Sequence, residues 1–253
     1  MGSSFSLLTS EPDGSLPSQS KPGLGDLPEG CVALILEYLE PQEICKLARL
    51  NRAFRGASWA DFVWESKLPS NYEGIVRKVF GDSVGNLGKR EIFAKLCRPN
   101  TFDKGTKKVW LDKSTGGVCM SISSKGLAIT GIDDRRYWNY IPTEESRLQL
   151  GKAYKRFGRR ICNLEHIHGW DIKPVRFQLW TSDGQNTTSH CFLGEPGKWK
   201  IYHVGDFVVD KSNAATKIKF SMTQIDCTHT KGGLCLDSVL IYPSECRERL
   251  KHF

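Results

Sequence analysis

Long apolar runs are absent from this 253-residue sequence, and no stretch approaches the roughly 20 consecutive apolar residues of a membrane-spanning helix. The N-terminus also lacks the basic start and apolar stretch of a secretory signal peptide. The 39% hydrophobic and 25% charged content is that of an ordinary soluble protein. We therefore expect a soluble protein of the cytoplasm, the nucleus or both.

Closely spaced cysteines are absent as well. The nine cysteines are an odd number, are widely spaced and include no C-x-x-C motif, so we expect reduced and mostly buried thiols rather than a disulfide framework. The pairs His166/His168 and Cys227/His229 are too isolated for a structural zinc site, which needs four ligands. We expect no metal site.

Catalytic signatures are missing too. The sequence contains no G-x-S-x-G motif, no Walker loop and no dinucleotide fingerprint. We therefore expect no catalytic residue, no cofactor and no enzymatic activity of the chain itself.

Basic residues are in excess, with a net charge of +8, but they are spread along the chain rather than gathered into one surface motif. The one dense cluster spans residues 151–160, GKAYKRFGRR. We interpret it as a solvated loop and strand; a nuclear-import patch or a phosphate-facing surface are the alternatives. We expect no nucleic-acid partner.

The first 25 residues are rich in Ser, Pro and Gly, which predicts disorder. They begin MGSSFS, which fits the N-myristoylation pattern with Gly2 as the acceptor. A single acyl chain gives only reversible membrane contact. Contact with a membrane is therefore expected only if Gly2 is acylated.

Short helices are predicted next, because Pro28 and Pro41 each suit the first turn of a helix and push the preceding residue out of the helical region. The predicted helices are 29–39, 42–50, 52–58 and 60–68, followed by two more around residues 75–80 and 92–97. Between Cys31 and Leu39 only Glu37 is charged. A surface helix needs an apolar stripe of roughly three positions in seven, so one apolar face of the first helix is left over. A partner helix is expected to cover it.

The apolar period changes to two after about Asp103, which predicts antiparallel strands. The last predicted strand runs from Leu234 to Tyr242. Residues expected on the inner faces of a β-sandwich are Val118, Met120, Phe177, Leu179, Phe220 and Met222. The predicted class is α+β, with a helical front end and an antiparallel, jelly-roll-like β-sandwich.

The helical front end resembles an F-box over some forty residues, from Leu27-Pro28 to the closing LARLNRAFR. The resemblance implies docking on a Skp-type adaptor, and through it on a cullin scaffold. The alternative is an ordinary small helical core. The positions that the resemblance assigns to adaptor binding are Leu27, Pro28, Val32, Ile35, Leu36, Leu39, Ile44, Cys45 and Leu50.

The β-half is similar to the plant phloem protein 2-like lectin domain, in particular to the F-box proteins of its A class. Three segments carry this resemblance: residues 129–147, 168–179 and 231–243. The expected domains are a disordered tail (1–25), an F-box (26–70), a helical linker (71–103), the β-sandwich (104–246) and a C-terminal tail (247–253).

Sugar-binding members of that family use tryptophan faces and acidic side chains, because an aromatic ring covers the C–H side of a sugar and a carboxylate accepts from its hydroxyls. The matching candidates are Trp138, Trp199 and Asp206. In the stretch WKIYHVGDF (199–207), however, Ile201 and His203 replace acidic positions of the family. Core or turn positions are the alternative roles of the tryptophans.

One family segment has no counterpart. Family members continue after the E-S-R motif with paired tryptophans and a strand pair, whereas this chain passes from Arg147 directly to LQLGK (148–152). The resemblance therefore implies that an internal strand pair is missing and that the sandwich is incomplete.

These features together predict the substrate-recognition subunit of a Skp-cullin-F-box (SCF) ubiquitin ligase, in which the β-domain recognises a target protein or a glycan. The alternative is a carbohydrate-binding protein without a role in ubiquitin ligation.

Overall fold

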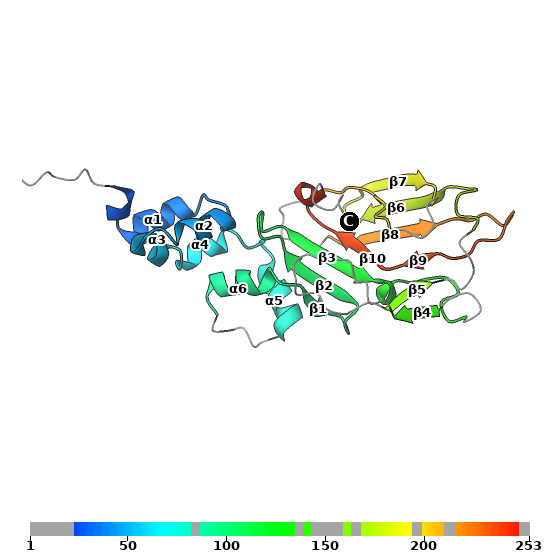
Figure 1. The fold of residues 1–253 in the computed structure, drawn as a ribbon, viewed down its shortest axis with the longest axis horizontal. Helices are drawn as coiled ribbons and strands as arrows, with labels where there is room; N and C mark the ends of the chain where they lie inside the picture. The colour runs from blue at the N-terminus through cyan, green and yellow to red at the C-terminus, as the bar shows by residue number, and fades with distance from the viewer. Residues whose placement is uncertain are drawn as a thin grey trace, which may run out of the picture.

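The computed structural model describes residues 23–81, 85, 87–134, 139–142, 159–162, 168–193, 199–209 and 216–247, with the backbone alone for 139–142 and 159–162. The molecule is elongated, with short helices at one end and β-sheets at the other (Figure 1). The predicted α+β class is confirmed, because N-terminal helices precede antiparallel sheets. No helix within the described ranges combines the length and apolar character that a membrane crossing requires.

The ends of the short helices follow from their local sequence. Pro41 occupies the first position of its helix, while Glu40 before it is extended. Pro28 is instead the N-cap of its helix, one position outside the predicted first turn. Asn51 caps another helix, because its Oδ1 accepts a hydrogen bond from the Phe54 backbone N–H at 2.9 Å. The helical elements are η1 (Leu24–Asp26), α1 (Glu29–Leu36), α2 (Pro41–Leu47), α3 (Arg52–Ala57), α4 (Asp61–Glu65), α5 (Tyr72–Phe80) and α6 (Lys89–Leu96).

One apolar cluster holds the helices together and continues into the first sheet. Trp64 of α4 and Phe93 of α6 pack with ring centroids 5.2 Å apart, and Trp64 Nε1 donates a buried hydrogen bond to the Ser58 backbone oxygen at 2.7 Å. Burying each large apolar side chain contributes about 1.5–3 kcal/mol. Leu111, on the first sheet, also belongs to this cluster, so the helical end is packed on the β-domain.

The strands form three sheets in which every described pair is antiparallel. Their orders are β1-β2-β3-β10, β4-β5-β9 and β7-β6-β8. The strands are β1 (Asn100–Phe102), β2 (Lys107–Leu111), β3 (Val118–Ser123), β4 (Asn139–Pro142), β5 (Arg159–Cys162), β6 (Val175–Thr181), β7 (Asn186–Cys191), β8 (Ile218–Thr223), β9 (Cys235–Leu236) and β10 (Ser238–Ile241). Short 3-10 turns lie at Ser124–Gly126 (η3) and Ser244–Cys246 (η4).

The first sheet corrects two predictions. β1 lies inside the segment predicted to be a helical linker, because three residues are too few to show an alternating pattern. Val118 was expected to face an opposing sheet, but it packs against the helical cluster. In β3 it is Cys119 and Ser121 that are buried, so this sheet is covered on both faces rather than on one.

The central strand of the third sheet follows its predicted alternation. Val175, Phe177 and Leu179 are buried. Phe220 and Met222 of β8 pair with Leu179 and Phe177 and are half-buried. The apolar face predicted for β6 and β8 is therefore present.

The predicted strand from Leu234 to Tyr242 is divided between two sheets. β9 pairs with β5, whereas β10 pairs with β3. At the break, the Ser124 backbone N–H donates a hydrogen bond to the Asp237 backbone oxygen at 2.9 Å. This one segment therefore connects the first and second sheets.

The cysteines differ from the prediction in two respects. Seven of the cysteines that the structure describes form no disulfide, but Cys235 is disulfide-bonded, so the expectation of wholly reduced thiols is wrong at that position. Of those seven, Cys119 and Cys246 are buried and the other five are half-buried or exposed, so "mostly buried" is also wrong. Burial raises the pKa of the half-buried Cys97 thiol to about 12, which keeps it protonated and unreactive at neutral pH.

Candidate functional site

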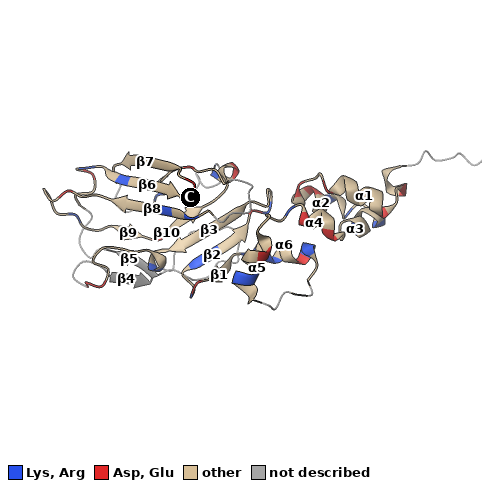
Figure 2. Ribbon diagram, turned by 180° about the vertical axis from the view of Figure 1, so that it is seen from behind, with Lys and Arg blue, Asp and Glu red and all other residues tan. Residues whose placement is uncertain are grey.

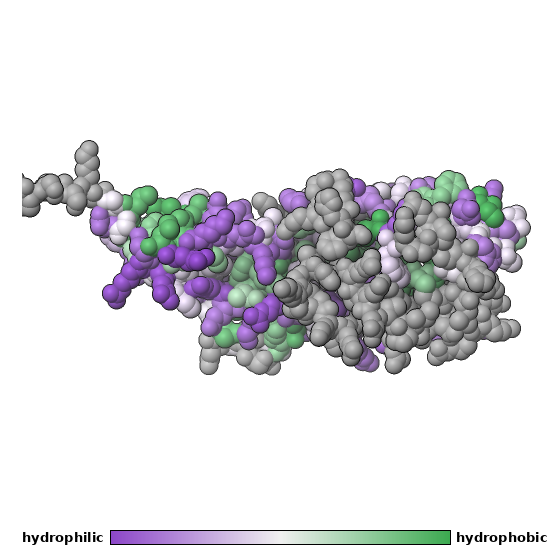
Figure 3. All heavy atoms as spheres, viewed as in Figure 1, coloured by the Kyte–Doolittle hydropathy of each residue, from purple (hydrophilic) through white to green (hydrophobic). Residues whose placement is uncertain are grey.

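Helix α1 has two apolar faces, and only one of them is buried in the helical core. Leu34 is 57% exposed, Ile35 is 43% exposed, and Tyr38 in the turn after the helix is 87% exposed. With the exposed Cys31 they recur at i, i+3, i+4 and i+7, the spacing of one helix face. We call these four residues the α1 stripe. Figure 3 shows exposed hydrophobic side chains gathered at the helical end of the molecule. The opposite, buried face carries Val32, Ala33 and Leu36.

The nine positions predicted to bind an adaptor divide into three groups. Val32, Leu36 and Ile44 are 0% exposed. They belong to the core and offer no surface to a partner, which corrects their assignment to direct contact. Leu27 and Leu39 are half-buried and pack against that core. The remaining positions are exposed, and their contact with an adaptor stays a prediction; they are Pro28, Ile35, Cys45 and Leu50.

Sequence reasoning missed several exposed apolar residues at the helical end. Leu34 and Tyr38 were not among the predicted docking positions, although their spacing from Cys31 and Ile35 is the signal that could have identified them. Trp59 is 57% exposed and Phe62 is 42% exposed. No periodic pattern marks these two, because they lie in and beside short turns between helices.

In the β-domain, an irregular segment (199–209) lies across the sheet β7-β6-β8. Tyr202 stacks on Phe177 of β6 with ring centroids 6.2 Å apart. Gln185, just before β7, makes two hydrogen bonds to the Val208 backbone, at 2.7 and 2.8 Å. At Gly205 an added Cβ would lie 3.0 Å from Thr187, so the segment approaches the sheet closely. This segment therefore packs against β6 and β7.

Two of the three carbohydrate-binding candidates lie on the 199–209 segment. Trp199 lies at its start and is 37% exposed. The Asp206 carboxylate is exposed, lies 3.1 Å from His203 Nε2 and lies 3.8 Å from Arg247 Nη1, so it is already engaged in polar pairing. Trp138, the third candidate, and Gly2, the acylation candidate, lie outside the described residues. Carbohydrate binding therefore stays a prediction.

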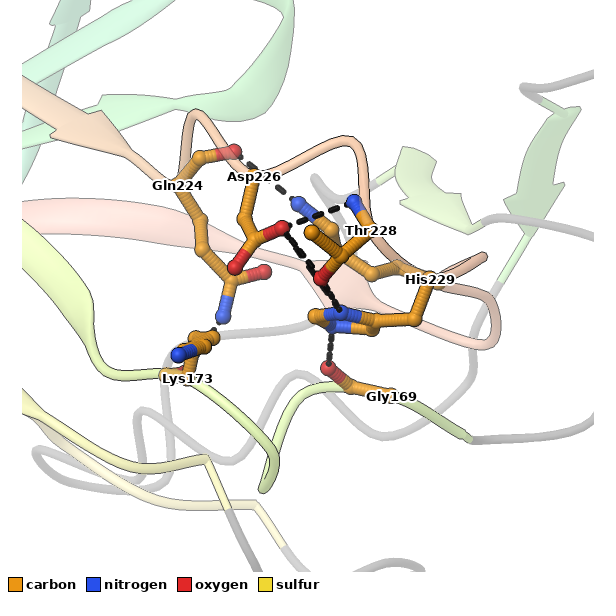
Figure 4. Close-up of polar contacts among 7 residues, drawn as sticks. Gly169, Lys173, Gln224, Asp226, Thr228 and His229 are labelled. Atoms are coloured by element: carbon orange, nitrogen blue, oxygen red, sulfur yellow. Dashed lines mark hydrogen bonds and ion pairs between the residues drawn. The ribbon is translucent and has the colours of Figure 1, made fainter.

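A polar cluster joins the loop after β8 to the loop before β6 (Figure 4). Asp226 Oδ1 accepts hydrogen bonds from the Thr228 backbone N–H at 2.8 Å and from Thr228 Oγ1 at 2.6 Å. These bonds hold the pKa of Asp226 below its ordinary value, the side-chain bond being the larger cause. His229 Nε2 donates to the Gly169 carbonyl at 2.9 Å, since a carbonyl only accepts.

Both nitrogens of the His229 ring face polar neighbours within the cluster: Nε2 lies 2.9 Å from the Gly169 carbonyl oxygen, and Nδ1 lies 3.2 Å from Thr228 Oγ1. The cluster therefore ties the two loops together. Within the described residues, no group of three or more His, Cys, Asp or Glu side chains could hold a metal ion.

Comparison with known proteins identifies the family. A family model described as phloem protein 2 matches residues 148–243. F-box protein PP2-A12 of Arabidopsis thaliana is 59% identical, over 92% of this chain and 92% of its own length. The chain belongs to the plant F-box proteins of the phloem protein 2 A class. Two further Arabidopsis thaliana members are similar: PP2-A11, at 54% identity over 99% of each chain, and PP2-A13, at 58% over 90% of each. No solved structure matches the chain significantly.

The alignments to the other A-class F-box proteins are longer than the chain. The PP2-A11 alignment spans 286 positions against the 253 residues of this chain, a difference of 33, so at least that many positions of the relative have no counterpart here. The phloem protein 2 match begins at Leu148, directly after Arg147, where the sequence predicts a missing strand pair. That junction lies outside the described residues, so the nature of the missing segment stays a prediction.

Proposed function

We propose that the protein is the substrate-recognition subunit of an SCF-type ubiquitin ligase. In this proposal the helical end docks on a Skp-type adaptor, and the β-domain holds a target protein or a glycan-bearing target. The chain contributes no chemistry of its own. It raises the local concentration of the target near the ubiquitin that the cullin-bound machinery carries.

The observation that carries this proposal is the α1 stripe on a chain that belongs to an F-box family. An apolar face of this kind on a short, well-packed helix suits a partner that lays its own helices against it. The helices that form the core leave the stripe exposed, although they bury the opposite face of the same helix.

Reconstitution tests the proposal. The full chain, a recombinant Skp-type adaptor and a cullin are mixed and separated by size exclusion, and the three are expected to co-elute. Ile35→Asp is expected to release the chain from the complex, because it places a charge on the stripe. Ile225→Asp is the matched control, since Ile225 is an exposed isoleucine of the β-domain. Separate elution of the wild-type chain and the adaptor would overturn the proposal.

We propose two further properties from the sequence: location in the cytoplasm or nucleus, and acylation of Gly2 with reversible membrane contact. Mass spectrometry of the N-terminal peptide from plant cells tests the second directly, and an acetylated or unmodified N-terminus would contradict it. The alternative function, carbohydrate binding without ubiquitin ligation, predicts glycan-array binding by a chain that does not retain the adaptor.

A further inference from the structure

A second feature of the helical end is a groove lined largely by arginine. The groove has a volume of about 850 Å³, and four of its nine lining residues are Arg49, Arg52, Arg55 and Arg90. We call it the arginine groove. The four arginines come from α3, α6 and the turn after α2. Figure 2 shows basic positions on α3 and α6 at this end of the molecule.

Arg90 is held in place by stacking rather than by an ion pair. Its guanidinium carbon lies 4.0 Å from the centroid of the Trp59 ring and 5.9 Å from that of Trp64. Stacking orients the planar group, but it leaves the positive charge and most of the N–H donors available. The groove therefore has a fixed cationic wall.

The four guanidinium groups have no acidic ion-pair partner among the residues that the structure describes. Among the described residues, no carboxylate lies within the 4.0 Å ion-pair distance of any of the four guanidinium groups. Two carboxylates of α4 are used by Lys89, the residue before Arg90: Glu65 pairs with Lys89 Nζ at 3.4 Å, and Asp61 accepts from the Lys89 backbone N–H at 3.0 Å.

The groove is continuous with the exposed positions that were predicted to bind the adaptor. Cys45 is one of those positions and is also part of the groove wall. Leu50, another of them, lies between Arg49 and Asn51, which both line the groove. A protein that covers Cys45 and Leu50 must also cover the arginines. If a neutral surface covered the arginines, their positive charges would be buried without a partner, which costs binding free energy.

The positive charge is local, which argues for a protein rather than a nucleic acid as the occupant. Residues 26–70 carry seven acidic and five basic side chains, so the groove is a cationic spot on a slightly acidic helical end. Nucleic-acid binding instead needs a basic stripe or face. The apolar walls at Cys45 and Trp59 also favour a polypeptide.

We propose that the arginine groove receives an acidic segment of the Skp-type adaptor, whose carboxylates pair with the guanidinium forks while its apolar side chains cover Cys45, Leu50 and Trp59. The inference rests on the proposed function and adds the chemistry of the contact. Arginine forks bind carboxylates with two parallel hydrogen bonds, so the contact supplies orientation as well as affinity.

The test is a titration of the full chain with a recombinant Skp-type adaptor at low and high salt. Arg52→Gln/Arg55→Gln is expected to weaken binding tenfold or more, on the order found for truncated charge pairs, and to reduce the salt dependence. Arg77→Gln/Lys125→Gln removes two exposed charges outside the groove and is expected to leave affinity within about twofold. Both double variants are expected to keep the wild-type unfolding temperature, because the four side chains are exposed.

The outcomes separate this inference from the proposed function. If Arg52→Gln/Arg55→Gln binds with wild-type affinity and salt dependence while Ile35→Asp does not bind, the groove contact is refuted and the adaptor role stands. If the groove variant binds the adaptor normally but loses a cellular target, the groove is a target site and the inference is also refuted. Failure of the wild-type chain to bind the adaptor refutes both.

Discussion

The helical end and the β-domain both expose apolar side chains, but on different kinds of backbone. At the helical end these residues lie on short helices and the turns between them, packed on one continuous core. In the β-domain they lie in irregular segments, and one such segment, 199–209, covers the sheet β7-β6-β8. The first arrangement leaves a preformed apolar helix surface exposed, whereas the second packs irregular backbone against a sheet. The exposed large apolar residues of the irregular segments are Ile172, Phe192, Trp199, Ile201, Val208, Val209 and Ile225.

The largest expected effect is a loss of stability on truncating the buried face of α1, with little change on truncating the exposed face. Leu36→Ala removes a fully buried side chain and is expected to lower the free energy of unfolding by about 2–5 kcal/mol. Leu34→Ala, two residues away on the stripe, is expected to change it by less than about 0.5 kcal/mol. Urea denaturation of the full chain followed by circular dichroism measures both. Equal losses would mean that α1 has no exposed face.

The next prediction addresses the β-domain. Inserting the strand pair that the family resemblance predicts after Arg147 is expected to raise the unfolding temperature and reduce self-association, because a strand pair buries apolar side chains worth about 1.5–3 kcal/mol each and removes open strand edges. Differential scanning calorimetry and light scattering compare the short and restored full chains. A short chain with an equally high, reversible transition would show that the 199–209 segment already completes the sandwich.

A third change tests whether the irregular segment 199–209 packs closely on the sheet β7-β6-β8. Gly205→Val is expected to destabilise the β-domain by about 1–3 kcal/mol, because an added Cβ at this position meets Thr187 at 3.0 Å. Gly184→Val is not a suitable control, because Gly184 has a φ of +92°, at which any side chain would strain the backbone. Gly74→Val is used instead, since an added Cβ there meets nothing within 4 Å and valine is a slightly better helix former than glycine, so no destabilisation is expected. Similar losses in thermal denaturation for both would argue against close packing.

The smallest effect concerns the polar cluster of Figure 4. The pKa of Asp226 is lowered, so the stability that its carboxylate contributes is present above the ordinary aspartate pKa and is lost as the pH falls through the lowered value. The Thr228 amide proton, which is bonded to this carboxylate, is expected to titrate below the ordinary aspartate range by NMR. Asp226→Asn is expected to abolish that titration. A midpoint at the ordinary value would show that the loop contact does not form in solution.

The sequence predicted the surplus apolar face of α1 and placed Ile35 on it, but not the other residues that form it. Two sets of apolar residues on this helix fit helical spacing: one contains Val32 and Leu36, the other Leu34 and Ile35. Tertiary packing alone decides which set is buried and which is exposed. The alternation in β6 was predicted correctly because it is a local property. The division of residues 234–242 between β9 and β10 was not, since pairing with two different sheets depends on strands far away in sequence.

The central claim is that the α1 stripe binds an adaptor, and an affinity measurement tests it most directly. The full chain, its Leu34→Ala/Tyr38→Ala variant and the Ile225→Ala control are titrated with a recombinant Skp-type adaptor by isothermal calorimetry. The account predicts that the double variant loses at least about tenfold in affinity, about 1.4 kcal/mol, while its unfolding temperature and the affinity of the control stay at wild-type values. Wild-type affinity in the double variant would contradict the claim.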